Sequence, residues 1–198
     1  MNIQAKKPLI TKHRPQPSRA IFASLLLAAL AVAVLAGSAL AAALVKNGSF
    51  EKDNNGDGIP NKWGASGGIT PADKRVCNQA KAGSCSFKMN ADGSEKSIFQ
   101  TVAVSGLAGA DHTLALWTKG KDLDLSGGAM RIFLRFNHIG LVGSTVYIID
   151  VPAGSSPWTK RSVTGASSAD FESITISVIT FATSGKAWFD QVKLTIAP

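Results

Sequence analysis

The sequence predicts an all-β sandwich, and three features of the chain from Leu44 onward indicate it. No stretch places apolar residues at the three- and four-residue spacing of a helix, several short runs alternate apolar and polar residues, and clusters of Gly, Ser, Asn or Pro separate these runs. Many short strands within 155 residues are typical of one domain built as a sandwich or jelly roll. The predicted strands are 75–77, 84–89, 97–104, 112–119, 130–137, 145–151, 159–163, 173–181 and 187–196.

The first 43 residues predict an export signal. Residues 1–20 carry five basic residues and no acidic one, and residues 21–45 carry no charge. The uncharged run is long enough to span a bilayer, but its Ala and Leu content and the small residues at 39–41 and 41–43 favour cleavage. We expect residues 1–43 to be a signal peptide, with an uncleaved membrane anchor as the alternative. Residues 44–198 are then expected to form a monomeric domain that is secreted or held at the cell surface.

The charge of the chain is concentrated in that first segment. The net charge is +8, but five of the 21 basic residues and none of the 13 acidic residues lie in residues 1–43. The rest of the chain therefore has a net charge of +3, and its Lys and Arg residues are scattered singly along the sequence. A nucleic-acid site needs basic residues gathered on one face or stripe. The sequence gives no indication of a nucleic-acid partner.

The two cysteines predict a disulfide. Cys77 and Cys85 are eight positions apart in a chain that is expected to be exported, where thiols oxidise. Two Cys residues without a neighbouring His make a poor zinc site. We expect a local disulfide that closes a short loop.

Two of the predicted strands carry a candidate ligand-binding face. Alternation in residues 130–137 puts Arg131, Phe133 and Arg135 opposite the core face, and alternation in residues 112–119 puts Trp117 opposite the two leucines. A sugar site needs such residues, because pyranose C–H bonds pack on an aromatic ring and Arg donates planar hydrogen bonds to hydroxyl oxygens. We therefore predict that Trp117, Arg131, Phe133 and Arg135 bind ligand. The alternative is that loops or the second sheet cover both rings, which then serve packing alone.

An acidic loop at the start of the domain is a candidate calcium site. Asp53, Asn55 and Asp57 present oxygens at every second position, and Gly58 follows them. This pattern matches the opening of an EF-hand loop, although Gly64 replaces the closing Glu and excludes a full EF-hand. The alternative is a solvated Asn/Asp/Gly turn without metal.

Several segments in order resemble a known family. The segments 44–51, 60–63 and 187–194 (LVKNGSFE, PNKW and AWFDQVKL) are similar to the first and last strands of carbohydrate-binding modules with the galactose-binding-like jelly-roll fold, the type appended to bacterial cellulases and xylanases. The middle segments 97–102, 104–107 and 112–117 (SIFQTV, VSGL and HTLALW) also match, so the resemblance covers essentially all of residues 44–198.

The resemblance implies both a metal and a ligand. It implies a structural calcium where the first and last strands meet, on Glu51 and Asp190, with Asn47 as a weaker candidate. The resemblance leaves two alternatives open: the Glu51 and Asp190 site is separate from the loop of Asp53, Asn55 and Asp57, or the two form one calcium site. The resemblance also implies polysaccharide or glycan binding on the concave sheet, which agrees with the face proposed for Trp117 and the arginines.

The sequence contains no recognisable catalytic set. We find no carboxylate pair placed to flank a sugar, no nucleophile with its base and no three-ligand metal motif. His112 is expected to be a surface or turn residue at the start of a strand. The prediction is a calcium-stabilised module that binds carbohydrate and is not an enzyme. The alternatives are a structural or adhesive sandwich that binds no sugar and, less favoured, a small glycoside hydrolase.

Overall fold

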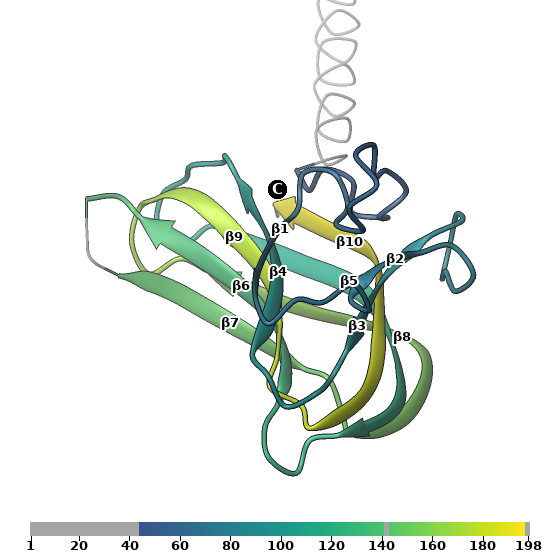
Figure 1. The fold of residues 1–198 in the computed structure, drawn as a ribbon. Helices are drawn as coiled ribbons and strands as arrows, with labels where there is room; N and C mark the ends of the chain where they lie inside the picture. Colours follow the sequence, from purple (N-terminus) through teal and green to yellow (C-terminus); the bar gives the residue numbers. More distant parts are fainter. Residues whose placement is uncertain (1–43, 141–142, 197–198) are drawn as a thin grey trace, which may run out of the picture. The chain divides into compact units, whose positions relative to one another are not determined.

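The computed structural model describes residues 44–140 and 143–196, and these form two five-stranded antiparallel sheets (Figure 1). Sheet A has the strand order β1-β4-β9-β6-β7, and sheet B has the order β2-β3-β10-β5-β8. The predicted all-β sandwich is confirmed, and the described residues contain no helix. Accordingly, no helix in this part of the chain is long and apolar enough to cross a membrane. The expected signal segment, residues 1–43, lies outside the described residues.

Strands β5, β6, β8, β9 and β10 are longer than the sequence predicts, whereas β3 and β4 are shorter. The strand bounds are β1 Gly64–Gly67, β2 Lys74–Val76, β3 Ser86–Asn90, β4 Lys96–Val102, β5 Asp111–Asp124, β6 Met130–His138, β7 Ser144–Asp150, β8 Gly154–Ala166, β9 Phe171–Thr180 and β10 Ser184–Ile196. All nine predicted strands are present, and β1 is the one that was missed. Its sequence, Gly-Ala-Ser-Gly, has little strand propensity and pairs along the edge of sheet A with β4. Strands β5 and β8 are longer than expected because irregularities in their pairing carry them past Gly120 and Pro157.

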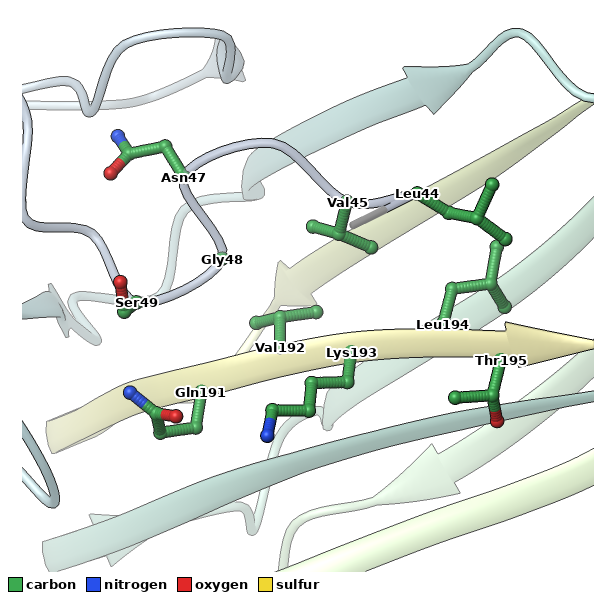
Figure 2. Close-up of a pocket in the computed structure, with 10 residues that line it drawn as sticks. All are labelled: Leu44, Val45, Asn47, Gly48, Ser49, Gln191, Val192, Lys193, Leu194 and Thr195. Carbon is green, nitrogen blue, oxygen red and sulfur yellow. The ribbon is translucent and has the colours of Figure 1, made fainter. Parts of the chain in front are cut away.

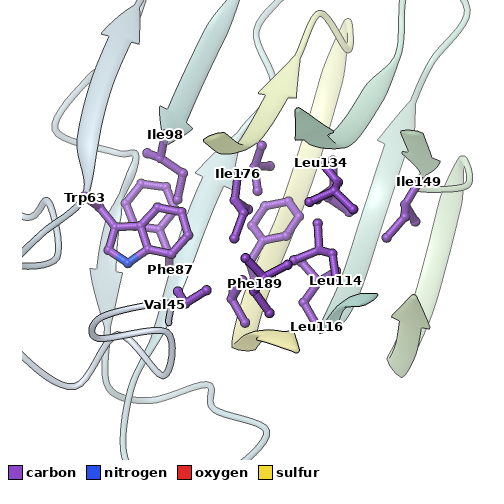
Figure 3. Close-up of a cluster of buried hydrophobic side chains, with 14 of the residues drawn as sticks. Val45, Trp63, Phe87, Ile98, Leu114, Leu116, Leu134, Ile149, Ile176 and Phe189 are labelled. Carbon is purple, nitrogen blue, oxygen red and sulfur yellow. The ribbon is translucent and has the colours of Figure 1, made fainter. Parts of the chain in front are cut away.

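The core fills the space between the inner faces of the two sheets. Figure 3 shows side chains from both sheets meeting there, with Ile98, Leu134 and Ile176 from sheet A facing Phe87, Leu114 and Phe189 from sheet B. Alternation along each strand puts these residues inside and the polar residues outside. The sandwich therefore presents two separate outer faces.

His112 belongs to this core, so the expectation of a surface residue is wrong. Because β5 begins at Asp111, His112 has the same phase as Leu114, and it is 2% exposed. Its ring meets Phe136 and Phe171 edge-on at centroid distances of 5.2 and 5.4 Å, and Nδ1 lies 2.8 Å from the carbonyl oxygen of Ala110.

The segment before β1 is fastened across the end of the sandwich. The side chain of Gln100 in β4 accepts a hydrogen bond from the Lys46 amide and donates one to the Lys46 carbonyl, at 2.7 and 2.8 Å. Phe50 is fully buried against Trp63 and Phe87, with ring centroids 5.1 and 6.1 Å apart. The segment before β1 is thereby held against the sandwich by Gln100 of β4 and Phe87 of β3.

A buried ion pair lies at the start of β4. The side chains of Lys96 and Asp73 are both fully buried, and Lys96 Nζ is 3.0 Å from Asp73 Oδ2. Lys96 also contacts the exposed carboxylate of Asp92 at 2.7 Å and donates to the Asn90 carbonyl at 2.9 Å. Asp73 accepts further hydrogen bonds from the amides of Thr70 and Asn90 and from the Thr70 hydroxyl. The buried charges of Lys96 and Asp73 therefore neutralise each other, which offsets the cost of burying them.

Candidate functional site

The four predicted ligand-binding residues lie on two different sheets. Arg131, Phe133 and Arg135 are on β6 and point to the outer face of sheet A, whereas Trp117 is on β5 and points to the outer face of sheet B. The expectation of one shared face is wrong, because strands β5 and β6 follow each other in sequence but pair in different sheets. Neither Trp117 nor Phe133 is sandwiched between the sheets; both rings are half-buried on outer faces.

The outer face of sheet A carries two aromatic rings in one cross-strand row. The strand pairing places Phe99 of β4 beside Ser177 of β9, and Ser177 beside Phe133 of β6. Neighbouring strands are about 4.8 Å apart, so the two phenylalanines are about 10 Å apart along the row. Gly64 on the neighbouring strand leaves space for Phe99, since a Cβ there would lie 2.7 Å from Phe99 Cζ. We call this surface the phenylalanine face; it comprises Phe99, Arg131, Phe133, Arg135, Ile148 and Ser177.

Polar groups surround the two rings. Arg131 Nε donates to Asp150 Oδ1 across the β6–β7 pair at 2.9 Å, and both side chains are well exposed. Arg135 donates no hydrogen bond to any described residue and is exposed. Hydroxyl pairs also cross the strands, with Ser66 and Ser97 Oγ atoms 2.7 Å apart and Thr101 and Thr175 Oγ1 atoms 3.0 Å apart. The face therefore combines apolar rings with hydrogen-bond donors and acceptors.

Sequence reasoning missed Phe99 and Ile148. Ile148 of β7 lies beside Phe133 and is 46% exposed, and Phe99 completes the row on the other side. Alternation in the predicted strand 97–104 already put Phe99 opposite Ile98, so the signal for an outward ring was present in the sequence. Its neighbour in space, Phe133, could not be known without the strand order.

The structure brings the two carboxylates that the resemblance implicates, Glu51 and Asp190, to one loop. Asp190 is fully buried, and its Oδ2 accepts hydrogen bonds from the amides of Lys81 and Ala82 at 2.8 and 3.1 Å. Glu51 Oε1 accepts from the amides of Ser84 and Cys85 at 2.9 and 3.2 Å. Burial, and then the nearby charge of Glu51, raise the pKa of Asp190 against the effect of these hydrogen bonds.

The charge and the oxygen atoms of this carboxylate pair suit a bound cation. Neither Glu51 nor Asp190 forms an ion pair with a described Lys or Arg, and two adjacent carboxylates repel each other unless a positive charge lies nearby. Hard oxygen ligands are those that calcium prefers. The described residues, however, contain no cluster of three or more His, Cys, Asp or Glu side chains spaced for a metal ion.

The side chains of Asn47 and of the acidic loop form hydrogen bonds with other residues of the same segment. Asn47 Nδ2 donates to the Lys52 and Asn61 carbonyls, and Asn47 Oδ1 accepts from the Lys52 amide. The carboxylate of Asp53 accepts from two glycine amides of the loop at 3.1 Å, and Asp57 accepts from the Asn55 side chain and from the Ile59 amide, both at 2.7 Å. This is the hydrogen bonding of an Asn/Asp/Gly turn.

The predicted disulfide is present. Cys77 and Cys85 are bonded, and they close the loop whose amides bind Glu51 and Asp190. Gly83 in this loop has a φ of 72°, and a Cβ there would collide with Glu51 Oε1. Glycine at this position therefore permits the close approach of the carboxylate.

A hollow lies where the segment before β1 crosses β10. Figure 2 shows it between residues 44–49 and residues 191–195, and its volume is 630 Å³. Within its lining, the Gly48 carbonyl accepts a hydrogen bond from the Val192 amide at 2.8 Å. Its lining has Lys193 but no aromatic ring and no carboxylate. The hollow therefore offers no ring on which a sugar could stack.

Comparison with solved structures identifies the fold. No protein-family model and no curated protein matches the sequence. TmCBM61, solved in complex with β-1,4-galactotriose, is similar with a TM-score of 0.53 and 18% identity over 78% of this chain and 98% of that chain. A family 16 carbohydrate-binding module-2 is similar with a TM-score of 0.51 and 16% identity, over 63% of this chain and 85% of that chain. The fold is the jelly roll of carbohydrate-binding modules.

A third similar structure is part of a larger protein. The enzymatically active domain of bacteriophage CBA120 tailspike protein 4 has a TM-score of 0.59 and 16% identity, and the match covers 77% of this chain but 21% of that chain. This chain therefore spans about a fifth of that domain. The predicted carbohydrate-binding-module fold is confirmed by the matches that extend over nearly the whole of the other chain.

Proposed function

We propose that this domain binds a polysaccharide on the phenylalanine face, outside the cytoplasm and without catalysis. The observation that carries the proposal is the row Phe99–Ser177–Phe133, in which two half-buried rings lie two strands apart on an open sheet. Rings at this spacing offer stacking surfaces for two sugar units of one chain. Arg131 and Arg135 flank Phe133 on the same strand and donate hydrogen bonds to hydroxyl oxygens.

The chemistry of this face supports binding rather than hydrolysis. Glycoside hydrolysis needs two carboxyl groups on opposite sides of the scissile bond. The row of Arg131 contains one carboxylate, Asp150, and its charge is paired with that arginine. The similarity to a module solved with a galactotriose supports a sugar as the class of ligand.

The test compares ring removal on and off the face. Phe133→Ala and Phe99→Ala are each expected to weaken retention on an insoluble polysaccharide, or affinity on a glycan array, by about tenfold, since stacking and burial of a half-exposed ring are lost. Phe181→Ala is the matched control, because Phe181 is 38% exposed but lies beyond the end of β9. Equal retention of all three variants, or an array without any hit, would favour a structural or adhesive role.

We also propose that calcium stabilises the domain through Glu51 and Asp190. The proposal is supported by the convergence of the two carboxylates on one loop, by their lack of a Lys or Arg partner among the described residues and by the raised pKa of Asp190. Calcium would supply the positive charge, and backbone carbonyls or water the remaining oxygens. Asp53, Asn55 and Asp57 remain a second candidate set, since their carboxylate oxygens have further lone pairs for a cation.

A further inference from the structure

The outer face of sheet B gathers lysines that are scattered in the sequence. Every strand of this sheet contributes at least one lysine that points outward. In β3, β5 and β10 the lysines alternate with core residues, whereas Lys74 of β2 and Lys160 of β8 pair directly with the outward residues Lys88 and Trp117. These seven residues define the lysine face: Lys74, Lys88, Lys119, Lys121, Lys160, Lys186 and Lys193. The five strands of sheet B carry nine basic residues (Lys or Arg) and four acidic residues (Asp). The five strands of sheet A carry three basic and two acidic residues. The sandwich is therefore electrically asymmetric.

The lysine face has little negative charge to balance it. None of its seven ammonium groups lies within 4.0 Å of a carboxylate in the described part of the chain. Three of the four aspartates of sheet B lie toward the two ends of β5, and the fourth, Asp190, is fully buried. Burial, and then the charges of Lys186 and Lys74, lower the pKa of Lys88. A surface lined by charges of one sign raises the local concentration of ligands of the opposite sign.

A groove around Trp117 lies within this face. Its volume is 330 Å³, and Trp117 lines it together with Lys160 from β8 and Lys193 from β10. Lys160 stands directly opposite Trp117 in the β5–β8 pairing. A third ammonium group, Lys81 Nζ, is 4.2 Å from the centroid of the Trp117 ring.

The disulfide loop sets the position of that third lysine. The Lys81 amide donates to Asp190 Oδ2, and Asp190 is itself the strand partner of Trp117 on β10. The Cys77–Cys85 bond and the buried carboxylate of Asp190 thus fix the loop from which Lys81 reaches over the ring. Three cations from three separate segments therefore surround one tryptophan.

We propose that the lysine face binds an acidic polysaccharide whose sugar rings carry carboxylates, with one uronate ring in the groove at Trp117. The ring packs on the indole, and Lys81, Lys160 and Lys193 supply charge to its carboxylate and to those of the neighbouring sugars. Lysine suits this role because its ammonium group is a compact charge with three rotatable donors that follow a flexible polymer. The proposal concerns a surface opposite the phenylalanine face and does not depend on it.

The cations of this face are lysines, and its composition favours a glycan over a membrane. The two arginines of sheet B are turned away from the face, Arg75 to the carbonyls of Phe50 and Glu51 and Arg161 to the Thr118 hydroxyl. An interfacial membrane site needs protruding apolar side chains. Of the large hydrophobic residues exposed in the described domain, Ile196 alone belongs to a strand of sheet B.

The experiment measures binding to polygalacturonate and to the same polymer with its carboxylates methyl-esterified. The unmodified domain is expected to bind the acidic form at 20 mM salt, at least tenfold more weakly at 300 mM salt because screening weakens exposed charges, and to bind the esterified form at least tenfold more weakly. Lys160→Gln/Lys193→Gln and Trp117→Ala are each expected to lower affinity for the acidic form about tenfold. Lys46→Gln/Lys62→Gln removes the same charge beside sheet A and is the matched control.

Three results would overturn the proposal: no binding to the acidic polymer at low salt, equal binding of the esterified polymer, or equal loss in the control variant. Double-stranded DNA and vesicles with anionic lipid, tested at matched charge, must bind more weakly than polygalacturonate; tighter binding of either assigns the face to that partner instead. Phe133→Ala must leave polygalacturonate binding unchanged. The phenylalanine face and the lysine face can therefore fail separately.

Discussion

Replacing Lys96 by methionine tests the account of the buried charges most directly. Methionine keeps much of the apolar stem of Lys96 but removes the ammonium group that contacts Asp73 and Asp92. Asp73 would then be a fully buried carboxylate without a cation. The exposed carboxylate of Asp92 would be hydrated in place of its contact with Lys96.

The structure sets the size of the effect. Breaking a buried ion pair by removing one partner costs about 3–5 kcal/mol, and loss of the exposed pair adds at most about 1 kcal/mol. Asp73 keeps its hydrogen bonds from Thr70 and Asn90, which continue to stabilise its charge. We therefore expect the lower end, a loss of about 3 kcal/mol in the free energy of unfolding, or about 6–12 °C in Tm for a domain of this size.

The pH dependence gives a second measurement on the same variant. In the native protein the pKa of Asp92 is lowered to about 2, chiefly by the hydrogen bond from Lys96, and hydrogen bonds lower that of Asp73 against the effect of burial. Groups with lowered pKa values stabilise the fold above their unfolded pKa, near 3.9, and lose this contribution as the pH falls toward about 2. In Lys96→Met the unpaired Asp73 takes up its proton more readily, so the deficit should be largest at pH 7 and shrink below pH 4.

Urea denaturation between pH 2.5 and 7 measures both quantities. Lys46→Met is the control, because Lys46 is exposed and forms no ion pair in the described structure, and it should change stability by less than about 0.5 kcal/mol. A loss below about 1 kcal/mol for Lys96→Met at pH 7, or a deficit that grows as the pH falls below 4, would refute the reasoning.

Two further predictions concern the loop between Cys77 and Cys85. Cys77→Ser/Cys85→Ser should lower the free energy of unfolding by about 2.5 kcal/mol, the chain-entropy value for a loop with a sequence separation of 8; an unchanged urea midpoint would mean that Glu51 and Asp190 hold the loop unaided. If calcium binds these carboxylates, a chelator should lower Tm by several degrees, since a ligand of the native state alone adds to stability. Asp190→Asn should abolish that difference, and an unchanged melting curve together with no calcium by elemental analysis would contradict the metal.

The sequence was sufficient for the fold and for the orientation of single strands. Alternation placed Arg131, Phe133 and Arg135 on an outer face and Leu114 in the core, and both predictions are confirmed. The disulfide between Cys77 and Cys85 also followed from spacing and the expected export. These features depend on residues near one another in the chain, where periodicity and composition carry the information.

The arrangement of the site could not be predicted in the same way. Alternation states which side of a strand a residue occupies, but it carries no information about which strands are neighbours. Phe99 and Phe133 share a row only because β9 inserts between β4 and β6, and Trp117 leaves that row because β5 pairs with β8 and β10. The low strand propensity of residues 64–67 hid β1, whose pairing with β4 is a tertiary effect.

The distribution of charge over the two faces also could not be predicted from the sequence, and it distinguishes the ligands that we propose for them. Along the sequence, the net charge of +3 and the scattered Lys and Arg residues gave no indication of a nucleic-acid partner. The clustering of lysines could not be seen there, since strands distant in sequence each bring a lysine to sheet B while sheet A stays nearly neutral. The two outer faces are separated by the thickness of both sheets and their shared core, so residues on one face do not contact residues on the other. Their contributions to binding should therefore be additive, and a polymer bound to the phenylalanine face would leave the lysine face open to a second, acidic polymer.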